Sequence, residues 1–77
     1  MKEKELVEYI AKSLVENPDE VSVKEVRGTS VMVLELHVGK DDMGRVIGKQ
    51  GRVANAMRTL LRVAAVKDGK HVTLEIV

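Results

Sequence analysis

Two glycines separated by two polar residues form the segment of this chain best suited to bind an anion. Gly48 and Gly51 enclose Lys49 and Gln50. Glycine adopts backbone angles with positive φ and has no Cβ to keep a ligand away from the main chain. Gly51 also lies where a helical pattern begins, so free N–H groups and the positive end of a helix dipole are expected beside the loop. Together these features favour the binding of a phosphate group.

The side chains around this loop strengthen the preference for a polyanion. Residues 43–67 contain six basic side chains and no acidic one, which is typical of proteins that bind nucleic acid. The alternative interpretation of such a charge run is a solvated helix face. We expect cations to contact phosphates, while the apolar Ile47 is suited to support a base. The predicted nucleic-acid-binding residues are Arg45, Ile47, Gly48, Lys49, Gln50, Gly51 and Arg52.

The spacing of the glycines excludes two other phosphate-binding motifs. A dinucleotide-binding fingerprint needs G-x-G-x-x-G after a strand, whereas Gly44, Gly48 and Gly51 are spaced G-x-x-x-G-x-x-G within a helical pattern. A P-loop needs four residues between its glycines and a hydroxyl that binds Mg²⁺. Here three residues separate Gly44 from Gly48, and Gln50 stands in place of the hydroxyl. The remaining interpretation is a G-x-x-G loop between two helices.

Hydrophobic periodicity predicts the elements that position this loop. The apolar stripe of an amphipathic helix is found in residues 2–16, 43–47 and 52–66. Pro18 ends the first of these helices, and Asp41 or Asp42 is a candidate cap of the second. Strand-like alternation is found in residues 21–26, 31–38 and 71–77. Val26 breaks the alternation of the first strand, which predicts a bulge or an early end there.

The order helix, strand, strand, helix, helix, strand predicts an α+β fold. The two strands joined by a short turn should pair antiparallel, and the helical crossover to the last strand favours a parallel pair. We therefore expect a three-stranded mixed sheet with three helices on one face. The other face should carry the polar residues Glu35, His37, Thr73 and Glu75. The predicted buried stripe of the last helix comprises Val53, Met57, Leu60, Leu61 and Ala64.

Length and composition exclude several classes of protein. At 77 residues the chain has room for one domain, residues 1–77. It has no cysteine, and its two histidines, His37 and His71, lack the spacing of metal ligands, so neither a metal nor another cofactor is expected. The sequence shows no nucleophile–base pair of the kind that would indicate an enzyme. Without a long apolar run or a signal peptide, the sequence predicts a soluble, cytoplasmic protein.

Residues 42–52 resemble the (V/I)-I-G-x-x-G core of KH domains. The N-terminal helix together with residues 17–21 resembles one small bacterial family with a single KH domain, KhpA or YlqC, and the similarity covers essentially the whole chain. This resemblance implies a type II (prokaryotic) KH fold and a non-enzymatic protein that binds single-stranded RNA. It further implies an RNA-chaperone or post-transcriptional regulatory role, formation of homodimers, and heterodimers with a larger KH-domain protein called KhpB or Jag. The alternative function is a protein-interaction and dimerisation module whose RNA contact is secondary.

Overall fold

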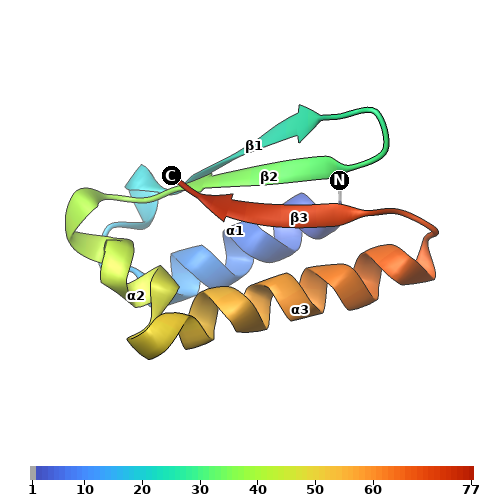
Figure 1. Cartoon of the computed structure of the whole chain (residues 1–77). Coiled ribbons are helices and arrows are strands. Elements are labelled where there is room, and N and C mark those ends of the chain that lie inside the picture. The colour runs from blue at the N-terminus through green and yellow to red at the C-terminus, as the bar shows by residue number, and fades with distance from the viewer. Residues whose placement is uncertain (1) are drawn as a thin grey trace.

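A hairpin and a parallel crossover build one sheet in the computed structural model, which describes residues 2–77 (Figure 1). Strand β1 (Ser22–Arg27) pairs antiparallel with β2 (Met32–His37), and β2 pairs parallel with β3 (Val72–Ile76). The strand order is β1-β2-β3, so β2 is central and β1 and β3 form the two edges. The predicted mixed sheet is therefore confirmed.

Within residues 2–77, three α-helices lie on one face of this sheet (Figure 1). They are α1 (Lys2–Leu14), α2 (Met43–Ile47) and α3 (Arg52–Lys67). Short 3₁₀ turns occupy Pro18–Glu20, Lys40–Asp42 and Lys49–Gly51. The order of elements and the placement of the helices agree with the fold predicted from the sequence. None of the helices in the described residues is long and apolar enough to cross a membrane.

Alternate residues of the central strand form the floor of the core. Met32, Leu34 and Leu36 of β2 are buried, and so is Leu74 of the neighbouring β3. Helix α1 covers them with Val7 and Ala11, and α3 covers them with Ala54, Met57, Leu61 and Ala65. Val46 of α2 joins the same core, so all three helices are held against the sheet.

Two expectations about single residues are wrong. Leu60 was expected in the core but is 51% exposed. Successive helical residues are about 100° apart around the axis, and the buried stripe of α3 passes through Met57 and Leu61, which leaves Leu60 on the solvent side. Residue Val26 marks no bulge, because β1 pairs with β2 without interruption and Val26 lies opposite Val33 on the uncovered face.

Candidate nucleic-acid interface

Three of the four residues of the loop between α2 and α3 adopt positive φ. Gly48 has φ 78° and ψ 171°, a region that is essentially restricted to glycine. Gln50 (φ 57°) and Gly51 (φ 76°) follow in the left-handed region, and Gly51 is the N-cap of α3. The Gly51 amide donates a hydrogen bond to the Gly48 carbonyl at 3.1 Å. The 48–51 loop is thus a tight reversal in which Lys49 and Gln50 form the apex.

The two glycines are needed for different reasons. A Cβ on Gly48 would lie 2.6 Å from Cγ2 of Val53 and 2.9 Å from its backbone nitrogen, so no side chain fits. A Cβ on Gly51 would meet only Nδ2 of Asn55, at an ordinary 3.6 Å. Gly48 is therefore required by close packing between α2 and α3, and Gly51 by its backbone conformation alone.

The hydrogen bonds of the loop determine which amides can face a ligand. The amide of Gly48 donates to the Gly44 carbonyl at 2.9 Å, and those of Gly51 and Arg52 donate to Gly48 and Lys49. The amides of Lys49 and Gln50, at the apex, are left as candidates to bind an anion. The side chains of Lys49, Gln50 and Arg52 are exposed, and the first turn of α3 has no acidic residue. A negatively charged group would therefore meet two cations and the positive end of α3.

Arg45, predicted to bind nucleic acid beside the loop, is paired with acidic side chains. Its Nη2 lies 2.6 Å from Oε1 of Glu16, and its Nε lies 3.3 Å from Oδ1 of Asp42. Sequence analysis missed this pairing because Glu16 is 29 residues away and shares no pattern with Arg45. The structure thus brings together Ile47, the 48–51 loop and Arg52, whereas Nη2 and Nε of Arg45 are already occupied by carboxylates.

Asp42 was a candidate side-chain cap of α2, but its side chain makes no capping hydrogen bond. Its carboxylate, 1% exposed, accepts hydrogen bonds from the backbone amides of Glu16 and Asn17, both at 3.1 Å. The Glu16 amide above all, then the Asn17 amide and the charge of Arg45, hold the pKa of Asp42 below its ordinary value against the opposing effect of burial. Asp42 therefore ties the end of α1 to the start of the helix that carries the loop.

Beyond the loop, the exposed face of α3 runs beside the free edge of β3. Nε of Arg58 donates to the Leu74 carbonyl at 3.3 Å, and its Nη1 donates to Oδ1 of Asn55 at 3.1 Å. These two bonds place a cation between α3 and β3. The Leu74 carbonyl carries no sequence signal, so this arrangement could not be predicted. Among residues 2–77, no group of three His, Cys, Asp or Glu side chains is placed to hold a metal.

The family model and the similar proteins found by comparison agree on one family. The family model described as KhpA/KhpB, KH domain, matches residues 4–76. The RNA-binding protein KhpA of Clostridium acetobutylicum is 58% identical over 74 residues, which cover 96% of this chain and 99% of that protein. The RNA-binding protein KhpA of Aquifex aeolicus is 51% identical over 73 residues, which cover 95% and 92% of the two chains.

Solved structures of the protein Era share the fold. Era of Aquifex aeolicus superimposes with a TM-score of 0.71 at 23% identity, and Era in complex with a 16S ribosomal RNA segment with a TM-score of 0.65 at 24% identity. Each match covers 96% of this chain but only 29% and 28% of the respective Era chain. At this identity the likeness shows the fold alone.

The two glycines should respond differently to the same substitution. We expect Gly51→Ala to cost about 1–2 kcal/mol, the penalty of a left-handed alanine. Gly48→Ala should cost clearly more, because the new Cβ adds a clash with the backbone of Val53. Urea unfolding of both variants, followed by circular dichroism, measures the difference. Equal losses would contradict the close packing of Gly48 against α3.

Asp42 should make stability depend on acid pH. Its pKa is lowered in the folded protein, so the stabilisation it provides is complete above the ordinary value of 3.8 and is lost as pH falls further through the folded value. Asp42→Asn should remove this dependence and lower Tm at pH 7 by roughly 5–10 °C. Thermal unfolding at several pH values measures both effects. Asp41→Asn, at the exposed neighbouring position, is the control, and an equal loss in that variant would contradict the assigned role of Asp42.

Proposed function

The chain belongs to the KhpA/KhpB family of KH domains, and from that membership we propose that it binds single-stranded RNA by gripping the phosphate backbone with the 48–51 loop. The family is non-enzymatic, and the relatives of this chain in Clostridium acetobutylicum and Clostridium perfringens are RNA-binding proteins. The observation that supports the proposal most strongly is the loop apex, where the amides and side chains of Lys49 and Gln50 project above the N-terminus of α3.

Each part of the loop has a distinct role in this proposal. The apex amides and the Lys49 ammonium bind phosphate oxygens, and Arg52 binds the same backbone from the first turn of α3. Ile47, which is 36% exposed, supports a base by apolar contact. Arg45 joins the phosphate contacts when RNA replaces Glu16 as its partner. Binding of this kind uses little aromatic stacking, which suits a chain with one tyrosine and no phenylalanine or tryptophan.

The same chemistry favours a role as a cytoplasmic RNA chaperone or post-transcriptional regulator. Contacts to phosphates fix the position of a nucleic acid but carry no sequence information directly. A domain of this size that grips mainly the backbone therefore binds many RNA strands weakly and releases them readily. Those are the properties that an RNA chaperone needs in order to act on many transcripts.

Pairing with a second KH domain is a further proposed function, supported by an apolar surface on α3. Leu60, Val63 and Val66 are 51%, 57% and 63% exposed. Leu60 and Val63 border a hollow of about 440 Å³ between α1 and α3, together with Leu6 and Ala64. We propose that another copy of this chain covers this surface, and that a KhpB-like (Jag) protein uses the same surface in a heterodimer. The family model that matches this chain includes both kinds of protein.

Reversing the charge of the loop apex should abolish RNA binding. In the variant Lys49→Asp/Gln50→Asp, two carboxylates face the phosphates, and we expect affinity for a labelled single-stranded RNA to fall about tenfold or more. Fluorescence anisotropy at several salt concentrations measures this loss. For the wild type, the log–log salt dependence should have a slope of about −0.7 for each phosphate contacted.

The matched control is Lys12→Asp/Ser13→Asp, which changes the net charge equally at exposed positions of α1. Circular dichroism should show that both variants are folded. The loop assignment is wrong if the apex variant retains wild-type affinity, or if the control loses as much affinity as the apex variant does.

Placing a charge in the apolar surface of α3 should prevent pairing. Leu60→Glu puts a carboxylate in the middle of the proposed contact, so we expect a dimeric wild type and a monomeric variant in analytical ultracentrifugation. Val26→Glu, at an exposed apolar position on the uncovered face of the sheet, should leave the dimer intact. A wild type that remains monomeric at high concentration would count against pairing of two copies.

A further inference from the structure

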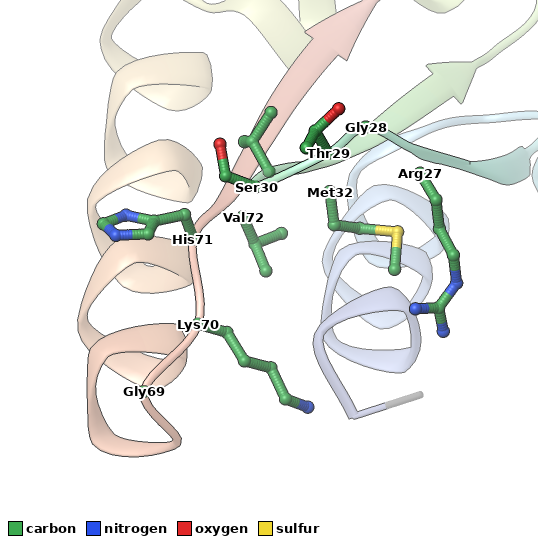
Figure 2. A pocket seen from close by; sticks show the side chains of 10 residues that line it. Arg27, Gly28, Thr29, Ser30, Met32, Gly69, Lys70, His71 and Val72 are labelled. Atoms are coloured by element: carbon green, nitrogen blue, oxygen red, sulfur yellow. The ribbon is translucent and has the colours of Figure 1, made fainter.

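Arg45 is the only lysine or arginine side chain that forms an ion pair within residues 2–77. Two of the unpaired cations, Arg27 and Lys70, project beside a hollow of about 390 Å³ between the β1–β2 turn and the α3–β3 turn (Figure 2). Of the described residues that line this hollow, none is acidic. An acidic partner is therefore not a general feature of the cations in this protein, and it occurs at the arginine that precedes the 48–51 loop.

The two carboxylates that contact Arg45 are held with very different firmness. Nε of Arg45 lies 3.3 Å from Oδ1 of Asp42, whose side chain is 2% exposed and is fixed by the backbone amides of Glu16 and Asn17. Nη2 of Arg45 lies 2.6 Å from Oε1 of Glu16, whose side chain is 72% exposed. Asp42 is thus a buried anchor for the guanidinium, whereas the Glu16 carboxylate approaches it from solvent.

The contact with Glu16 can be exchanged for a phosphate without moving the anchor. An ion pair at the surface is weak, because water solvates both charges and because two long side chains lose freedom when they pair. A guanidinium presents its N–H groups as a planar fork, which binds two oxygens of one phosphate. With Nε held on Asp42, the two terminal nitrogens of Arg45 remain for such a group. Glu16 then returns to water.

The position of this ion pair places it at the edge of the proposed RNA site. Arg45 lies three residues before Gly48, less than one helical turn along α2. On its other side, Glu16 follows the end of α1, and the exposed Asp19 comes three residues later. Arg45 therefore stands where the basic loop region meets the acidic end of α1, within reach of a nucleic acid backbone on one side and of a carboxylate on the other.

We propose that Glu16 is an affinity-determining residue of the RNA site. Its carboxylate occupies Arg45 in the free protein, competes with the RNA backbone for the guanidinium, and so weakens RNA binding. The inference rests on the proposed RNA-binding function and adds to it a residue outside the loop that lowers the affinity. A bound strand displaces Glu16, and the carboxylate is ready to take Arg45 back when the strand leaves, which favours release.

The test measures the affinity of labelled octauridylate for Glu16→Gln, which keeps the size of the side chain and removes its charge. We expect this variant to bind about threefold more tightly than the wild type, the change that corresponds to one exposed ion pair. The matched control is Asp19→Asn, which removes the same charge at an exposed position that pairs with no described cation and should bind nearly as the wild type does. Because the expected effect is a gain, partial unfolding cannot produce it.

A second pair of variants shows whether the gain passes through Arg45. Glu16→Gln/Arg45→Gln should bind no more tightly than Arg45→Gln, because no guanidinium is left to release. The proposal is overturned if Glu16→Gln gains no more affinity than Asp19→Asn, or if its full gain persists when Arg45 is replaced, since the charge then acts only at long range. Failure of the proposed function is recognised separately, by unchanged affinity in the loop variant Lys49→Asp/Gln50→Asp.

Discussion

The packing of Gly48 against Val53 is the contact on which the loop and its surroundings depend. A side chain at Gly48 would overlap both the side chain and the backbone of Val53, so α2 and α3 approach more closely than any other residue permits. The chain then has to reverse within four residues, and the left-handed conformations of Gln50 and Gly51 accomplish this. As a consequence, Lys49 and Gln50 are held in solvent above the first turn of α3. The buried carboxylate of Asp42 holds the other end of α2 against the end of α1.

Much of the fold and the position of the loop could be predicted because they depend on local patterns. The alternation of Leu34 and Leu36 identifies the central strand, and the pair Gly48 and Gly51 marks the reversal between two helices. The incorrect predictions concern which side of a helix or strand a single residue lies on. Leu60 lies next to a buried residue in sequence, and only the placement of α1 and the sheet decides which side of α3 is covered. The same holds for Val26: β1 pairs with β2 without interruption, and Glu25, opposite the buried Leu34, takes the core-side position.

The electrostatics of the site could be predicted only in part. The excess of positive charge after residue 43 is visible in the sequence, and so is its association with the loop. Which cations are free is a property of the fold, because Glu16 reaches Arg45 across 29 residues. The structure therefore separates an arginine occupied by acidic partners from Lys49 and Arg52, which face solvent. It also gathers Arg58 and Arg62 of α3 with Lys70 and His71 of the following turn around one hollow.

The central claim is that the 48–51 loop is the part of the molecule that grips RNA. The most direct measurement is an NMR titration of ¹⁵N-labelled protein with a short single-stranded RNA, which follows every backbone amide at once. The account predicts that the amides of Lys49, Gln50 and the first turn of α3 shift first and furthest. Shifts confined to the apolar surface around Leu60 and Val63, with the loop amides unchanged, would contradict it.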